Sequence, residues 1–195
     1  DTYPFEILAN RVLPEFKNNA APVKIWSSAC SSGQEPYSIA MTYLEYKAKN
    51  PGGLKGGIRI TATDISNKVL DQCAVGEYDS LAIARGLSAE RQKKFFTEGG
   101  KPGAMKVKNE VKSFVQFRHL NLLDSYALLG KFDIIFCRNV LIYFSAEVKR
   151  KIIAQFRQSL NPGGYLIAGS SELAGDVPEL YEPIECPSGT AYRKK

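Results

Sequence analysis

Residues 25–40 of the chain are IWSSACSSGQEPYSIA, and this stretch decides the fold. It continues a short run of β-branched and aromatic residues that starts at Val23 and ends at Trp26. Small residues fill Ser27 to Gly33, and Pro36 then stands where the first turn of a helix accepts proline. Apolar residues recur beyond it at helical spacing, at Ile39, Ala40, Tyr43 and Leu44. The stretch therefore predicts a strand, a tight loop and a helix.

The same order of elements recurs along the chain. Ile58–Thr63 predicts a second strand that ends at Asp64, and Ser66 and Ser145 can each cap a following helix. Further strands are predicted at Phe114–Phe117, Phe132–Phe136 and Tyr165–Ala168. The helix after Ser66 has its inner face at Val69, Leu70 and Cys73, and the helix after Ser145 has its inner face at Val148, Ile152, Ile153, Phe156 and Leu160. Asn161–Gly164 breaks the second helix, and a closing hairpin is predicted within Tyr181–Tyr192. Strands that alternate with amphipathic helices predict an α/β fold, with a mostly parallel sheet covered on both faces and an antiparallel closing hairpin.

A chain of 195 residues fits one domain, 1–195, which buries roughly 70% of the surface that the unfolded chain exposes. One stretch, 95–118, interrupts the alternation with glycines, a proline and short apolar runs. It predicts a small antiparallel β insert between two elements of the main sheet.

The net charge of +6 comes from one segment. Arg85 to Arg118 contains nine basic and three acidic residues, and the remaining 17 basic and 17 acidic residues cancel. The basic residues of this segment are Arg85, Arg91, Lys93, Lys94, Lys101, Lys106, Lys108, Lys112 and Arg118. We therefore expect an acidic partner to dock at this segment, with a solvated charged face as the alternative.

Several classes of protein are disfavoured. No apolar run approaches the ~20 residues of a membrane-spanning helix, and the start of the chain lacks the pattern of a signal peptide, so a cytoplasmic protein is expected. The four cysteines form no CxxC pair and the only histidine is His119, which indicates neither a metal site nor a disulfide framework. Walker A, GxSxG and HExxH motifs are absent.

Polar residues follow the predicted strands at the edge where an open α/β sheet binds ligands. Asp64 can accept hydrogen bonds from both hydroxyls of a ribose, and Asn121, Arg138 and Asn139 follow two later strands. Taken singly, each is also typical of an ordinary turn or cap. Together with the small-residue loop they predict a nucleoside pocket. The loop has no GxGxxG, which disfavours an NAD-dependent oxidoreductase and leaves a nucleoside without a pyrophosphate, such as S-adenosylmethionine.

Five segments resemble, in order and spacing, the chemotaxis receptor methyltransferases of the CheR family. They are Ile25–Ala40, Ala62–Ile65, Asn121–Leu123, Phe132–Phe144 and Pro162–Leu166, which together span most of the chain. The resemblance implies a Rossmann-like methyltransferase sheet and methyl transfer from S-adenosylmethionine to glutamate side chains of bacterial chemoreceptors, with S-adenosylhomocysteine as product. It implies a cytoplasmic enzyme recruited to membrane receptor arrays, with no nucleic-acid partner and no insertion into the membrane.

The resemblance also implies roles for individual residues. Glu35 and Asp64 match residues that hold the cofactor, Asp64 at the ribose. Asn121 and Leu122 match residues beside the adenine.

The resemblance implies two more residues in the cofactor pocket and one residue near the methyl group that is transferred. Arg138 and Asn139 match residues that line the cofactor pocket, and Tyr143 matches a tyrosine close to the methyl group. Arg138 is also expected to guide the substrate carboxylate, because its fork can hold a carboxylate bidentately. Tyr143 and Arg138 are therefore the candidate catalytic residues. The alternatives are a buried brace for the cofactor loops at Arg138 and a packing ring at Tyr143.

The chain departs from the family pattern in several places. Relatives carry an N-terminal helical domain that this sequence is expected to lack, and they commonly have Gly at Ala29 and His at Ser170. The loop Glu98–Ala104 is shorter than in members that grip a tethering peptide of the receptor. The alternative function is a catalytically weak signalling module that binds S-adenosylmethionine or S-adenosylhomocysteine.

Overall fold

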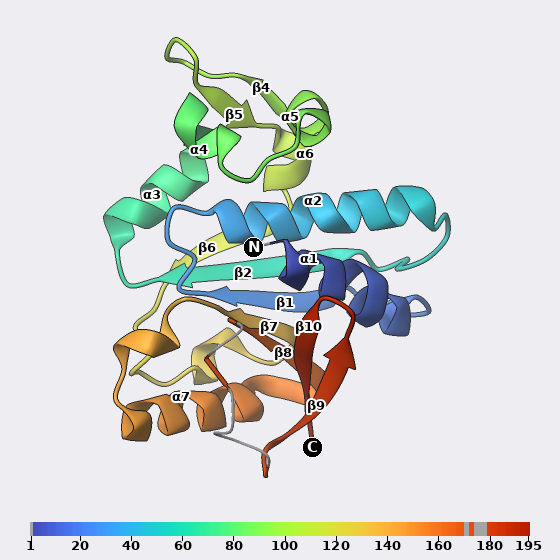
Figure 1. Cartoon of the computed structure of the whole chain (residues 1–195), viewed down its shortest axis with the longest axis vertical. Coiled ribbons are helices and arrows are strands. Elements are labelled where there is room, and N and C mark those ends of the chain that lie inside the picture. Colours follow the sequence, from blue (N-terminus) through green and yellow to red (C-terminus); the bar gives the residue numbers. More distant parts are fainter. Residues whose placement is uncertain (1, 170–171, 174–178) are drawn as a thin grey trace.

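The computed structural model describes residues 2–169, 172–173 and 179–195, and Ser170 lies outside this part. A seven-stranded sheet with the order β6-β2-β1-β7-β8-β10-β9 forms the centre (Figure 1). Its strands are β1 (Val23–Ser28), β2 (Ile58–Asp64), β6 (Val115–His119), β7 (Phe132–Cys137), β8 (Leu160–Ala168), β9 (Tyr181–Cys186) and β10 (Gly189–Lys194). The first five in spatial order are parallel, and β9 and β10 form an antiparallel hairpin beside β8. The predicted α/β fold with a closing hairpin is confirmed.

Helices cover both faces of this sheet. Figure 1 shows α2 on one side of the strands and α7 on the other. The helices and short helical turns are α1 (Tyr3–Ile7), η1 (Leu8–Val12), η2 (Leu13–Phe16), α2 (Gln34–Lys49), α3 (Asn67–Val75), α4 (Ser80–Ala84), α5 (Ala89–Phe95), α6 (Asn109–Lys112), η3 (Ala127–Leu129), η4 (Leu141–Tyr143) and α7 (Ala146–Ser159).

The period of two in β1 explains why both faces are covered. Ile25 packs into the hydrophobic cluster on the α2 side, and the next residue, Trp26, packs into the cluster on the α7 side. Both side chains are fully buried, and the Trp26 indole Nε1–H donates to Thr63 Oγ1 at 3.0 Å. A strand that is apolar on both faces must lie at the centre of a three-layer fold.

The two predicted helix caps are confirmed. Ser66 accepts a hydrogen bond from the Val69 N–H, and Ser145 accepts one from the Val148 N–H. One predicted boundary is wrong, because Leu160 begins β8 instead of completing the inner face of α7. Its backbone is extended, and Asn161–Gly164 lies inside β8 next to a register shift against β7. The helix thus ends one residue earlier than predicted, and Asn161, which precedes Pro162, is itself biased toward an extended backbone.

A second, three-stranded antiparallel sheet with the order β3-β5-β4 stands above the main sheet in Figure 1. Its strands are β3 (Glu77–Tyr78), β4 (Phe96–Glu98) and β5 (Met105–Val107). The sheet therefore starts earlier than the expected insert at 95–118, and residues 115–119 belong to the main sheet as β6. We call residues 77–112 the insert below.

Among the described residues, no helix combines the length and the apolar character that crossing a membrane requires.

Candidate functional site

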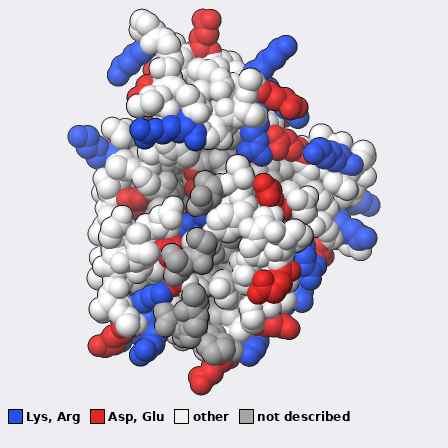
Figure 2. Space-filling view, in the orientation of Figure 1, with Lys and Arg blue, Asp and Glu red and all other residues white. Residues whose placement is uncertain are grey.

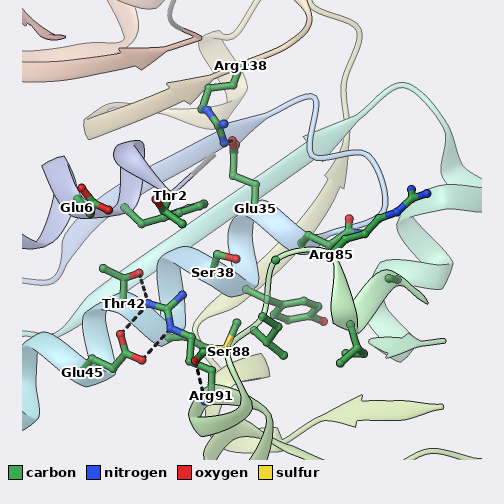
Figure 3. A pocket seen from close by; sticks show the side chains of 18 of the residues that line it. Thr2, Glu6, Glu35, Ser38, Thr42, Glu45, Arg85, Ser88, Arg91 and Arg138 are labelled. Carbon is green, nitrogen blue, oxygen red and sulfur yellow. Dashed lines mark hydrogen bonds and ion pairs between the residues drawn. The ribbon is translucent and has the colours of Figure 1, made fainter. Parts of the chain in front are cut away.

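A cleft of about 1220 Å³ opens where the parallel strands end. Its walls are the loop after β1, one face of α2 along nearly its whole length, α1 with the start of η1, and the segment from α4 to α5 (Figure 3). Small-molecule pockets are typically about 300–1,000 Å³, so this cleft can hold a nucleoside cofactor with space to spare. Of the predicted site residues, Glu35, Arg138 and Asn139 line it.

Glu35 and Arg138 meet at the end of this cleft. Figure 3 shows the two side chains pointing at each other from α2 and from the end of β7. Arg138 Nη1 lies 3.2 Å from Glu35 Oε2, and Ser27 Oγ donates to Glu35 Oε1 at 2.7 Å. Burial raises the pKa of the Glu35 carboxyl above its ordinary value of 4.5, against the opposing effects of Ser27 and Arg138. A further charged group placed beside this pair would therefore change the ionisation of Glu35.

The loop between β1 and α2 is held in an unusual backbone conformation. Ala29, Ser31 and Gly33 have φ values of +56°, +48° and +88°. A side chain at Gly33 would come within 3.0 Å of Cys73 Sγ and of the Tyr78 hydroxyl, so only glycine fits there. The loop thus keeps its backbone close to the cleft.

Asp64 fastens this loop to the end of β2. Its Oδ2 accepts the Ser31 N–H at 2.9 Å, and its Oδ1 accepts the Ser66 N–H at 3.0 Å. Asp64 does not itself line the cleft, but Ser31 does. Each carboxylate oxygen retains a lone pair, so the group can still accept from ligand hydroxyls.

Asn121 and Leu122 follow β6, next to the end of β2. The Leu120 N–H donates to the Asp64 carbonyl at 3.0 Å, which places this segment beside Asp64. The Leu122 side chain is buried in the cluster on the α7 side, whereas its neighbour Leu123 is 57% exposed. Ile65, directly after Asp64, is 62% exposed. The sequence analysis did not identify Leu123 and Ile65 as exposed side chains, because apolar residues in such positions look the same as core residues in a sequence.

Asn139 and Tyr143 lie on the segment that follows β7. Asn139 adopts a left-handed conformation with φ +57°, and Tyr143, at the end of η4, is 79% exposed. Tyr143 lies outside the lining of the cleft, as do Asn121 and Leu122. The sequence analysis also missed Glu172, a buried carboxylate that contacts this segment. No motif marked it, since its partners are backbone groups.

The residues fit S-adenosylmethionine by the chemistry of their groups. A largely buried carboxylate at Glu35 suits an ammonium group, and Asp64 suits a pair of ribose hydroxyls. The loop at 29–33 allows close approach of a ligand to the backbone. Within residues 2–169, 172–173 and 179–195, no three His, Cys, Asp or Glu side chains are grouped to hold a metal ion.

The basic residues of the insert divide into two groups. Arg91, Lys108 and Lys112 are half-buried and make structural contacts. Arg91 pairs with Glu45 on α2, and the ammonium groups of Lys108 and Lys112 donate to the carbonyls of Lys94 and Val75.

The remaining basic side chains of the segment are exposed, namely Arg85, Lys93, Lys94, Lys101, Lys106 and Arg118. Figure 2 shows basic side chains projecting around the upper part of the molecule with acidic ones between them. On the face in view they do not form one continuous patch.

Comparison with known proteins agrees with this geometry. Residues 1–190 match the family model described as "CheR methyltransferase, SAM binding domain". The chain belongs to the CheR methyltransferase family. A chemotaxis protein methyltransferase of Vibrio parahaemolyticus is 56% identical over 195 residues, which cover 100% of this chain and 70% of that protein. Chemotaxis protein methyltransferase 1 of Pseudomonas aeruginosa is 54% identical over 197 residues, which cover 100% and 72%.

Solved structures share the fold of this CheR family member. The N-methyltransferase NodS of Bradyrhizobium japonicum, in complex with S-adenosylhomocysteine, superposes with a TM-score of 0.55 at 15% identity, covering 98% of this chain and 88% of that chain. Magnesium protoporphyrin IX methyltransferase of Synechocystis, with bound S-adenosylmethionine, gives 0.52 at 12% identity, covering 97% and 76%. The Rossmann-like methyltransferase fold and the use of S-adenosylmethionine are thus confirmed, and the CheR family member is an S-adenosylmethionine-dependent methyltransferase of chemotaxis.

Proposed function

We propose that this chain transfers the methyl group of S-adenosylmethionine to glutamate side chains of bacterial chemoreceptors and so forms methyl esters for chemotactic adaptation. The observation that carries the proposal is the Arg138–Glu35 pair at the end of the cleft, with Tyr143 on the segment that follows. It offers a guanidinium for a carboxylate substrate beside the carboxylate that suits the cofactor.

The cofactor would be held by residues from four strand ends. Glu35 would accept from its ammonium group and Asp64 from its ribose hydroxyls, while Asn121 and Leu122 would flank its base. Asn139 and Arg138 would close the pocket from the end of β7. When bound, the cofactor supplies a methyl group on a sulfonium, and transfer exchanges one C–S bond for one C–O bond.

The substrate glutamate needs no general base. Its carboxyl has an ordinary pKa near 4.3, so it is already ionised at neutral pH. This agrees with a chain whose only histidine, His119, is exposed at the end of β6. The task left to the protein is to align the attacking oxygen and to exclude water.

Arg138 and Tyr143 would share that alignment. Because Arg138 is already paired with Glu35, its charge is partly balanced, and an incoming carboxylate would be oriented without losing its nucleophilicity. The Tyr143 hydroxyl is exposed and free to reach a second substrate oxygen or the edge of the methyl group.

Methyl transfer to receptor-enriched membranes tests the proposal. With S-adenosylmethionine labelled in the methyl group, label should enter the receptor and should be released as methanol in mild base, because esters hydrolyse and N-methyl groups do not. A receptor with its methylated glutamates replaced by alanine is the control. Tight cofactor binding without label in the receptor would favour the signalling-module alternative.

A Tyr143→Phe variant separates a catalytic role from a binding role. We expect kcat to fall by about tenfold or more while the Kd of S-adenosylhomocysteine stays within about threefold, since only the hydroxyl is removed. Equal losses in both quantities would assign Tyr143 to cofactor binding.

A further inference from the structure

Glu172 is the most completely hydrogen-bonded carboxylate near the site. Its side chain is 2% exposed, in the segment after β8. Oε1 accepts the N–H groups of Val140 and Leu141, both at 2.9 Å. Oε2 accepts the N–H groups of Asn139 and Gly169, at 2.8 and 2.9 Å. Both oxygens thus accept two donors each, in the charge-assisted geometry that makes hydrogen bonds strong.

Three of these donors are consecutive and stand between the two candidate catalytic residues. Asn139 to Leu141 begins directly after Arg138, and the Tyr143 N–H donates back to the Val140 carbonyl at 3.2 Å. The left-handed backbone at Asn139 also needs support from its surroundings, because that conformation is costly for a residue with a side chain. One buried carboxylate therefore fixes the course of the chain from Arg138 to η4.

We infer that Glu172 is a positioning residue for methyl transfer, which acts by holding the backbone of Asn139–Leu141 so that Arg138 and Tyr143 face the reacting atoms. The inference rests on the proposed function for the roles of those two side chains. Glu172 itself contacts only backbone groups in the hydrogen bonds described above. A displacement of about 1 Å at a reacting group can cost about 100-fold in rate, so holding this segment matters for turnover.

Neither close analogue of glutamate can replace it. Glutamine would turn an amide NH₂ toward two backbone N–H donors, which leaves those donors unpaired. Aspartate is shorter by one C–C bond, about 1.5 Å, and cannot reach all four donors. Gly169 packs directly against this carboxylate, because a Cβ at that position would come within 2.3 Å of Glu172 Oε2. Gly169→Ala should therefore disturb the carboxylate without changing its charge.

The test compares Glu172→Gln with a matched control, Asp133→Asn. Asp133 is also a carboxylate that accepts a backbone N–H, from Lys24 at 2.8 Å, and it also accepts from Asn161 Nδ2 at 2.8 Å. It lies at the start of β7, the edge of the sheet opposite the site. Loss of its charge should lower stability without touching the site.

We expect Glu172→Gln to lower kcat at saturating S-adenosylmethionine by at least about tenfold and to raise the Kd of S-adenosylhomocysteine by a clearly smaller factor, since Glu35 and Asp64 remain in place while Asn139 loses its support. Gly169→Ala should reproduce this split, and the double variant should be no worse than Glu172→Gln alone. Asp133→Asn should keep wild-type kcat. A Glu172→Gln protein with wild-type kcat, or kcat losses that track the fall in Tm in both variants, would overturn the inference.

Hydrogen exchange gives a readout that needs no substrate. The amides of residues 139–141 should exchange faster in Glu172→Gln than in the wild type, and should be unchanged in Asp133→Asn. Unchanged exchange in Glu172→Gln would also overturn the inference. If the wild-type protein does not label receptor glutamates, the proposed function fails, whereas the exchange data still decide whether Glu172 holds the segment.

Discussion

Ala29 shows how a single residue stores strain in the loop that borders the cleft. Its φ of +56° lies in the left-handed region, where a Cβ costs roughly 1–2 kcal/mol. Ser31 repeats the conformation two residues later, and its N–H is fastened by Asp64. The family resemblance implies glycine at this position in relatives, and a left-handed backbone at Ala29 would account for such a preference.

Ala29→Gly should relieve this strain. The gain is offset by the greater freedom of glycine in the unfolded chain, about 0.5–1 kcal/mol, so the free energy of unfolding should stay level or rise by up to about 1 kcal/mol. The control is Ala74→Gly on the exposed side of α3, which should destabilise by about 1 kcal/mol. Urea denaturation of both variants checks the prediction, and equal losses would show that Ala29 is unstrained.

Glu35 should give cofactor binding a pH dependence. Burial raises the pKa of Glu35 in the folded protein above 4.5. The folded state therefore favours the protonated form, and the free energy of unfolding decreases as the pH rises toward the raised pKa and Glu35 ionises. If the ammonium group of the cofactor pairs with Glu35, binding needs the ionised form. The affinity for S-adenosylhomocysteine should therefore fall as pH drops through the raised pKa.

Calorimetry between about pH 4.5 and pH 8 measures this effect, with proton release expected on binding at the acid end. Glu35→Gln should bind more weakly, with an affinity that varies less with pH. A wild-type affinity that does not vary with pH from about pH 4.5 upward, and that Glu35→Gln leaves unchanged, would remove Glu35 from the ammonium site.

At the scale of elements, the sequence predicted the main sheet well because its strands are long and apolar on both faces, as Ile25 and Trp26 illustrate. The start of the insert escaped prediction because β3 has two residues and no periodicity. Arg138 was singled out in the sequence because it follows a strand, whereas its ion pair with Glu35 on α2 was not expected, and the roles of both side chains stay predictions. Glu172 was not predictable, since backbone N–H groups are present at almost every position.

The insert packs on α2 through a shared hydrophobic cluster, and one arginine adds polar contacts between them. Arg91 on α5 makes hydrogen bonds to both carboxylate oxygens of Glu45 and one to Thr42 Oγ1, and Figure 3 shows these contacts in the wall of the cleft. The Arg91 and Glu45 side chains are 22% and 31% exposed.

Arg91→Ala should lower the free energy of unfolding by about 1–2 kcal/mol, because a bidentate, partly buried pair is lost. The matched control is Lys151→Ala, which breaks an ion pair with Glu147 whose side chains are 69% and 78% exposed and which should change stability little. Denaturation at two salt concentrations checks both. Equal effects in the two variants would show that Arg91 does not anchor the insert.

At the scale of the whole molecule, the basic residues that carry the charge of +6 fall into two groups. The half-buried Arg91 and Lys112 link the insert to α2 and α3, Lys108 makes a contact within it, and only the exposed members of the segment remain for a partner. If the segment docks an acidic receptor surface, as we propose, the intermingled charges in Figure 2 favour local contacts over long-range attraction alone.

Reversal of exposed charges tests this docking. Lys101→Glu with Lys106→Glu should raise the KM for receptor membranes several-fold and weaken its salt dependence, with kcat unchanged. The control, Lys17→Glu with Lys55→Glu, alters net charge equally but at exposed sites outside the insert. Lys108 is left intact because its ammonium group caps the end of α5. Equal effects in both double variants would indicate that the exposed basic residues of the insert form a solvated surface and do not dock a partner.

The place of β1 in the sheet has a consequence for how the chain folds. Its neighbours are β2, which follows it closely, and β7, whose Asp133 lies 109 residues from Lys24. Such distant pairings slow folding, because a long loop must close before they form. The insert lies within the loop between β2 and β6 and pairs its strands locally. If the insert folds early, it shortens the flexible chain between β1 and β7 and so lowers the entropic cost of pairing these strands. The segment that is proposed to meet the receptor then also helps the main sheet to assemble.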